Sequence, residues 1–149
     1  MRRNIETQVA IDAPLDVVWD VVVDLDRYRE WNPFIIEARG KAEVGQELSL
    51  RMQRPKKSEE EVHKPTVTVV ERNRMLQWSG IIRHASIFRA RHEFLLEKND
   101  KGGAGGVLLR QREDFGGLTM PLAGGMVWRI EEGFLLMNAA LKVRAESIA

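Results

Sequence analysis

The sequence predicts an α+β fold, in which a curved antiparallel sheet of seven strands wraps around one long C-terminal helix and two short helices follow the first strand. Apolar residues alternate with period two in residues 3–11 and through most of residues 34–115. Helical spacing appears briefly in residues 14–31 and again, as a long apolar stripe, in residues 119–148. We expect residues 1–149 to form a single domain, because this length is typical of one domain.

The first strand and the two short helices follow from local patterns. In residues 3–11 one face carries apolar side chains, of which Ile5 and Ile11 are the first and last. Asp12 can cap the next helix, and Pro14 suits a first helical turn. Helical spacing of apolar residues then continues to residue 23, and residues 24–31 form a second short helical segment that ends before Pro33.

Period-two alternation then predicts the remaining six strands. Their ranges are 34–40, 47–53, 64–72, 75–82, 87–98 and 106–115. The segment 54–61 is rich in charge, and we expect it to be a solvated loop. The glycine-rich segment 99–105 has the composition of a hairpin tip.

The C-terminal helix is expected to start near Thr119, which can cap it. Its glycines are unusual, because each costs a helix roughly 1 kcal/mol relative to alanine. Either the helix begins later, or small residues such as Gly133 leave room for a close neighbour or a ligand. Since a strongly curved sheet cannot touch a straight helix everywhere, side chains or a ligand must fill the space between them.

Three inward-facing polar residues are candidates for chemistry in that space. His92 shares a strand face with apolar neighbours, and Gln111 and Glu113 share a face of the next strand. If the segment 99–105 closes a hairpin, His92 lies near Gln111, with Glu113 one step further along, so the three could form one polar cluster on an apolar wall. The cluster could orient a ligand, transfer a proton, or be a buried pair that satisfies itself.

Large apolar residues on inner faces would form the rest of the cavity wall, and methionine adapts well to irregular shapes. These candidates are Trp31, Phe34, Met52, Trp78, Phe88, Phe94, Phe115, Met126, Ile130, Phe134 and Met137. For each aromatic residue, ordinary core packing is the alternative. Leu135 lies off the main helical stripe and could mark the pocket mouth or a homodimer contact.

Composition excludes several classes of function. The net charge is +1, from 23 basic and 22 acidic residues, which argues against nucleic acid or anionic membrane as a partner. The chain has no cysteine, and its histidines lack metal-ligand spacing, so we expect no metal and no cofactor. No apolar run is long enough to span a bilayer and no signal peptide is evident, so we expect a cytoplasmic protein with no integral membrane association.

The order of these elements and several short motifs resemble the START-like (SRPBCC, helix-grip) superfamily, in particular its polyketide cyclase/dehydrase and lipid-transport branch. The motifs are Ile11-Asp12-Ala13-Pro14, Tyr28-Arg29-Glu30-Trp31-Asn32-Pro33-Phe34, Leu76-Gln77-Trp78, His92-Glu93-Phe94-Leu95 and Arg112-Glu113-Asp114-Phe115-Gly116. The resemblance covers essentially the whole chain. It implies the fold but no single function, because the superfamily includes carriers, receptors, cyclases and chaperone activators.

Three functions remain open at this point. The first is binding of a small hydrophobic molecule, such as a lipid, polyketide, isoprenoid or aromatic metabolite. The second, implied by the resemblance, is a cyclase or dehydratase that acts on a poly-β-carbonyl substrate, with His92 or Glu113 as acid or base. The third is an interaction module without a ligand cavity, which would act as a regulator or chaperone cofactor.

Overall fold

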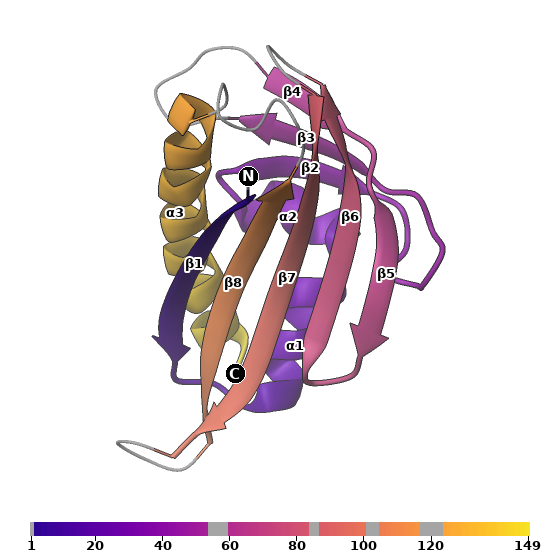
Figure 1. The fold of residues 1–149 in the computed structure, drawn as a ribbon. Helices are drawn as coiled ribbons and strands as arrows, with labels where there is room; N and C mark the ends of the chain where they lie inside the picture. The colour runs from indigo at the N-terminus through magenta and orange to yellow at the C-terminus, as the bar shows by residue number, and fades with distance from the viewer. Residues whose placement is uncertain (1, 54–59, 84–86, 101–104, 117–123) are drawn as a thin grey trace.

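The computed structural model describes residues 2–53, 60–83, 87–100, 105–116 and 124–149. Within these residues the fold is α+β, with eight strands in two antiparallel sheets, three α-helices and one 3-10 turn (Figure 1). The curved sheet and the C-terminal helix agree with the sequence analysis. The prediction of seven strands in one sheet was wrong.

The larger sheet has five strands and the smaller sheet has three. The order in the larger sheet is β1 (Arg2–Ile11), β8 (Gly106–Gly116), β7 (Ile87–Asn99), β6 (Met75–Arg83) and β5 (Thr66–Glu71). The order in the smaller sheet is β2 (Ile35–Arg39), β3 (Ser49–Gln53) and β4 (Glu60–His63). The two sheets meet where Glu47 bridges to Thr66 and the Leu48 N–H donates to the Pro65 carbonyl over 2.8 Å.

The strand that the sequence analysis did not predict is β4. It begins inside the segment 54–61, which was expected to be a solvated loop. Its residues pair with β3 in the register Met52 to Glu61 and Leu50 to His63. The inward side chains of β4 are polar and its outward Val62 is 57% exposed, so the usual alternation is inverted. A search for apolar inner faces therefore could not find this strand.

The helices are α1 (Leu15–Val23), α2 (Tyr28–Trp31) and α3 (Gly124–Ile148), and the 3-10 turn is η1 (Leu25–Arg27). The predicted start of the last helix, residues 119–123, lies outside the described residues. Asp12 does not cap α1 with its side chain. Instead its backbone N–H donates to Glu146 of α3 over 2.9 Å. Hydrogen bonds from Lys142 and from this N–H lower the pKa of the Glu146 carboxyl, so the end of α3 is fastened to the loop after β1.

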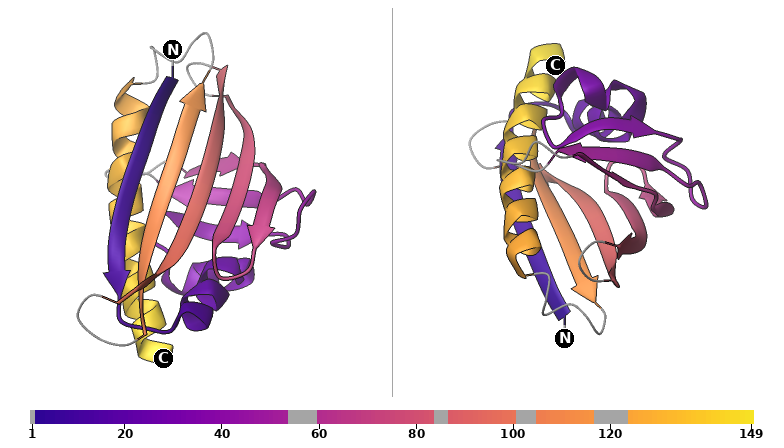
Figure 2. Two further views of the ribbon diagram at one scale, coloured as in Figure 1. Left: turned by 60° about the horizontal axis from the view of Figure 1, so that its bottom comes forward. Right: turned by 90° about the horizontal axis from the view of Figure 1, so that it is seen from above.

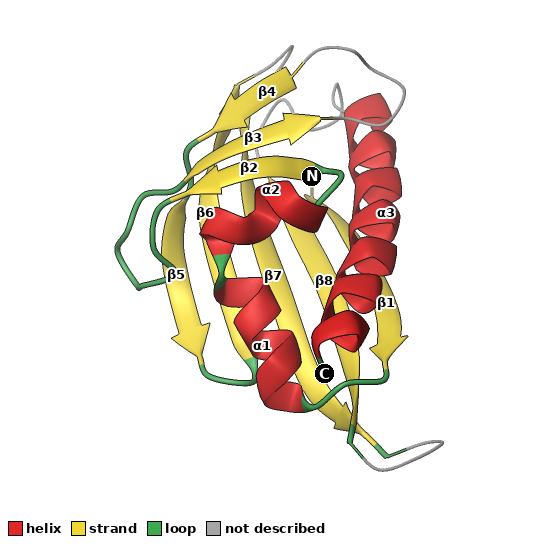
Figure 3. Cartoon of the chain, turned by 180° about the vertical axis from the view of Figure 1, so that it is seen from behind, coloured by secondary structure: helices red, strands yellow, loops and turns green. Residues whose placement is uncertain are grey.

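The three helices lie on the concave face of the larger sheet (Figure 3). Figure 2 shows α3 running alongside β1, while the smaller sheet crosses over one end of the larger sheet. Buried residues from both sheets and the helices meet in one core between these layers, including Phe34, Leu50, Leu76, Phe94 and Phe134. No helix in the described part of the chain is long and apolar enough to cross a membrane.

The convex face of the larger sheet carries charged side chains that pair with one another. Glu93 is only 5% exposed, because Arg112 contacts its carboxylate at 2.8 Å and Arg91 contacts it at 3.4 Å. The hydrogen bond to Glu93 raises the pKa of the Arg112 guanidinium. These residues stabilise each other, so the search for a functional site moves to the concave face.

Candidate functional site

Three inner-face residues stand side by side across the centre of the larger sheet. Trp78 of β6 is opposite His92 of β7, and His92 is opposite Glu113 of β8. Directly opposed side chains on one face of an antiparallel pair lie close together. His92 Nδ1 is therefore 2.9 Å from Glu113 Oε2, and the two residues are only 4% and 8% exposed.

Aromatic side chains hold the His92 ring in place. The Trp78 ring stacks on it, with centroids 4.9 Å apart and planes 12° apart. Phe134 of α3 meets it edge-on at 4.8 Å, and Phe94 packs against it at 4.6 Å. The remaining ring nitrogen, Nε2, is buried and has no hydrogen-bond partner among the described residues.

The bond to Glu113 determines what Nε2 can do. Because a carboxylate only accepts hydrogen bonds, Nδ1 carries the proton that joins the pair. A neutral His92 then has only a lone pair on Nε2, which suits a hydroxyl donor, whereas a protonated His92 would donate from Nε2 to a carbonyl. A buried polar atom left without a partner is rare and needs an explanation.

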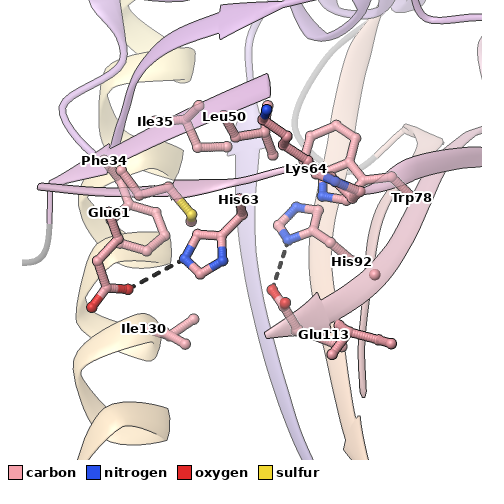
Figure 4. A pocket seen from close by; sticks show the side chains of 15 residues that line it. Phe34, Ile35, Leu50, Glu61, His63, Lys64, Trp78, His92, Glu113 and Ile130 are labelled. Atoms are coloured by element: carbon pink, nitrogen blue, oxygen red, sulfur yellow. Dashed lines mark hydrogen bonds and ion pairs between the residues drawn. The ribbon is translucent and has the colours of Figure 1, made fainter. Parts of the chain in front are cut away.

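His92 and Glu113 form part of the wall of a cavity of about 50 Å³ between the two sheets and α3 (Figure 4). One water molecule needs roughly 10–15 Å³, so the cavity has room for a small group of atoms. The lining residues are Phe34, Ile35, Leu50, Met52, Glu61, His63, Lys64, Pro65, Trp78, Gly80, Ile81, Ala90, His92, Glu113 and Ile130. Lys64 and Ile81 are exposed and mark its mouth.

Small residues create this space. The row next to Trp78 and His92 consists of Gly80 paired with Ala90, and neither reaches far from the sheet. Space for a side chain at Gly80 is limited by the neighbouring chain, because a Cβ there would lie 3.1 Å from Pro65 Cα. The cavity is therefore formed where the smaller sheet meets the larger one above two small side chains.

The structure places several predicted site residues in this wall. Six of them line the cavity: Phe34, Met52, Trp78, His92, Glu113 and Ile130. Four more are fully buried in the core, outside this lining: Phe94, Phe115, Phe134 and Met137. Phe88 and Met126 belong to β7 and α3, but their side chains are not among those that the structure describes.

Gln111 is not part of one polar cluster with His92, because the predicted register of β7 and β8 was wrong by two residues. Gln111 is opposite Phe94, and its Nε2 donates to Asn138 Oδ1 of α3 over 2.6 Å. Asn138 in turn donates to Thr7 Oγ1 over 2.9 Å. The hairpin pairs as far as Asn99 and Gly106, which moves Glu113 to the position next to His92.

Trp31 lies on another side of the molecule. It packs edge-on against Tyr28, with centroids 5.1 Å apart, and lines a surface groove with Arg27, Arg144 and Ile148. The sequence analysis assigned it to the cavity wall because it lies near the start of the predicted strand 34–40, but α2 turns it toward the end of α3.

The sequence analysis missed a second polar part of the wall, which β4 supplies. His63 Nε2 is 3.3 Å from Glu61 Oε2, and both side chains line the cavity (Figure 4). The signal that could have found them is the parity that Glu61, at the end of the charged segment 54–61, shares with His63. No group of three or more His, Cys, Asp or Glu side chains that could hold a metal ion occurs in the described ranges.

Comparisons with known proteins agree on the kind of fold. A family model described as polyketide cyclase / dehydrase and lipid transport matches residues 2–144. No curated protein matches the sequence.

Solved structures with this fold cover nearly the whole chain. An aromatase/cyclase from Streptomyces sp. R1128 is 18% identical with a TM-score of 0.77, over 98% of this chain and 94% of that one. A START superfamily protein from Mycobacterium smegmatis is 19% identical with a TM-score of 0.74, over 98% and 99%. Protein MLL2253 from Mesorhizobium loti is 17% identical with a TM-score of 0.75, over 99% and 98%. At these identities the likeness concerns the fold alone.

Proposed function

Because the chain belongs to the polyketide cyclase / dehydrase and lipid transport family, whose model matches residues 2–144, we propose that it binds a small hydrophobic molecule in the cavity beside His92. The predicted resemblance to the START-like superfamily is confirmed by this match and by the solved structures. Lipids, polyketides, isoprenoids and aromatic metabolites are the candidate classes.

The observation that carries this proposal is the unpartnered Nε2 of His92. The ring is held by Glu113 on one side and by Trp78 on its face, so Nε2 keeps a constant direction. A ligand hydroxyl or carbonyl would satisfy it, and the apolar wall would bind the rest of the ligand. Apolar pockets with a few convergent polar groups are the usual form of small-molecule sites.

The size of the cavity limits the ligand. A volume of about 50 Å³ is well below the roughly 300 Å³ at which ordinary ligand pockets begin. Even a single-ring compound therefore enters only if wall side chains move, since a cavity that holds benzene measures roughly 150 Å³. Met52 lines the cavity and has the flexibility for such adjustment.

Filling the cavity tests the proposal. Ala90 lines it, so Ala90→Leu should abolish the binding of para-propylphenol, followed by amide NMR shifts, while the protein stays folded. Ala139→Leu is the matched control, because Ala139 is exposed on α3 and lies outside the lining. Unchanged binding by the Ala90→Leu protein would contradict the proposal. Failure of the unmodified protein to bind a panel of apolar ring compounds would also contradict it, and would favour an interaction module.

The His92–Glu113 pair also supports a second candidate, an acid–base enzyme acting on a poly-β-carbonyl substrate. A carboxylate that orients an imidazole in the wall of a cavity is a suitable arrangement for proton transfer. Asparagine at position 92 can still donate to Glu113 but lacks an atom at the Nε2 position. His92→Asn should therefore abolish cyclisation of such a substrate while binding persists, and an undiminished rate would exclude this role.

A further inference from the structure

A second histidine–carboxylate pair faces the same cavity from the smaller sheet. His63 Nε2 lies 3.3 Å from Glu61 Oε2, and the two side chains are 17% and 25% exposed. In Figure 4 this pair and the His92–Glu113 pair enter the cavity from different sheets. The first pair comes from β7 and β8, and the second comes from β4 alone.

The inward direction of this second pair runs against the ordinary preference of a strand. Strand β4 could bury Val62 and expose its polar neighbours, but it does the reverse, with Val62 57% exposed. The register with β3 specifies this choice, since Glu61 is opposite Met52 and His63 is opposite Leu50, and both partners line the cavity. A slip of one residue would turn Val62 inward. Placing two polar side chains on a buried face costs free energy unless they find partners there.

The hydrogen bonding of His63 leaves one nitrogen for a ligand. Its Nε2 is joined to Glu61, and its Nδ1 has no hydrogen bond to any residue in the described ranges. A neutral ring that donates from Nε2 to the carboxylate can only accept at Nδ1. The two histidines therefore offer the same chemistry, a hydrogen-bond acceptor backed by a carboxylate.

We propose that the cavity recognises a ligand with two polar ends, one hydroxyl bound by His92 and a second oxygen function bound by His63 at the β4 wall, with an apolar ring or short chain between them. This inference rests on the proposed binding function and makes it more specific. Phe34, Trp78 and Ile130 supply the apolar surface for the middle of such a ligand. A molecule with only one polar end would leave one of the two pairs unused.

Two probes that differ in one group test the inference. Para-propylphenol ends in a methyl group, and para-(hydroxyethyl)phenol carries a hydroxyl in its place. Glutamine at position 63 can keep an amide near Nε2 for Glu61, but it has no acceptor near Nδ1. We expect His63→Gln to weaken the binding of para-(hydroxyethyl)phenol by about 2–10-fold in Kd, which corresponds to the loss of one hydrogen bond. The Kd for para-propylphenol should stay unchanged.

Two further variants separate the possible outcomes. His92→Asn should weaken the binding of both probes by similar factors. Glu60→Gln, on the outward face of β4, should leave the binding of both probes unchanged. If His63→Gln affects both probes equally, or neither, while His92→Asn still weakens both, the two-ended ligand is overturned and the proposed binding function survives. If the unmodified protein binds neither probe at millimolar concentration, both proposals fail.

Discussion

At the scale of single residues, the protein contains two kinds of buried polar group. The chain from Gln111 through Asn138 to Thr7 ties β8, α3 and β1 together and lies behind the cavity wall. The His92–Glu113 pair lies on the wall itself and leaves Nε2 unpartnered among the described residues. The first group holds elements together, although Gln111 Oε1 is likewise unpartnered among the described residues, whereas the second is the group that we propose binds a ligand.

The internal chain should be costly to break. Asn138→Ala removes the partner of Gln111 Nε2 and of Thr7 Oγ1, both in residues that are at most 7% exposed. Each stranded group costs about 1–3 kcal/mol, so we expect the free energy of unfolding, measured in urea, to fall by about 2 kcal/mol or more. Asn4→Ala, at an exposed position of β1, should change it by less than about 0.5 kcal/mol. Equal losses for the two variants would refute the structural role of this chain.

At the scale of elements, contact between α3 and the segment before β2 depends on one glycine. An added Cβ at Gly133 would lie 2.5 Å from the ring of Phe34, which is 1% exposed and cannot easily move away. The same ring meets Phe134 edge-on at 5.9 Å. The sequence analysis left open whether helix glycines make room for a neighbour or a ligand, and at Gly133 the neighbour is Phe34.

Two opposing effects decide the outcome of Gly133→Ala. Alanine favours a helix by about 1 kcal/mol, whereas overpacking a buried contact costs about 1–3 kcal/mol. We expect a net loss of about 1 kcal/mol in the free energy of unfolding by urea. The control is Ala139→Gly at an exposed position of the same helix, which should lose about 1 kcal/mol from helix propensity alone. A stabilised Gly133→Ala protein would show that Phe34 yields easily.

The same scale explains what could be predicted from the sequence. Seven strands and the three helices follow from periodicity, because each has an apolar inner face, as in residues 3–11 and in the stripe that includes Ile130 and Phe134. Strand β4 has no such face, since Glu61 and His63 point into the cavity. The pairing of His92 with Glu113 depends on hairpin register, which the glycine-rich loop does not reveal, although the shared face was predicted correctly. Half of the candidate site was therefore accessible to pattern analysis, and the polar half that β4 supplies was not.

At the scale of the whole molecule, the two sheets differ in how firmly they are held. Strands β7 and β8 each have a neighbour on both sides in the larger sheet. Strand β4 is four residues long and stands at an edge of the smaller sheet. The smaller sheet joins the larger one near Glu47, Leu48 and Gly45, through a few backbone hydrogen bonds.

Hydrogen exchange should report this difference. Amides of β4 should exchange at least roughly 10-fold faster than those of β7 and β8, because edge elements with little buried surface open locally without global unfolding. Addition of para-(hydroxyethyl)phenol should slow exchange in β4, since His63 would then hold the ligand. Uniform protection across both sheets, measured by amide NMR, would contradict the expected difference.

The pair of small residues beneath the cavity has a consequence for how proteins of this shape diversify. A side chain at Gly80 would crowd Pro65, whose Cα would lie 3.1 Å from the added Cβ. Ala90, which is paired with Gly80, lines the cavity. Replacing Ala90 by glycine would therefore enlarge the cavity, and replacing it by valine would make the cavity smaller, with the surrounding sheet unchanged. Related chains could therefore change the size of the cavity by single replacements at this position while keeping His63 and His92 in its wall.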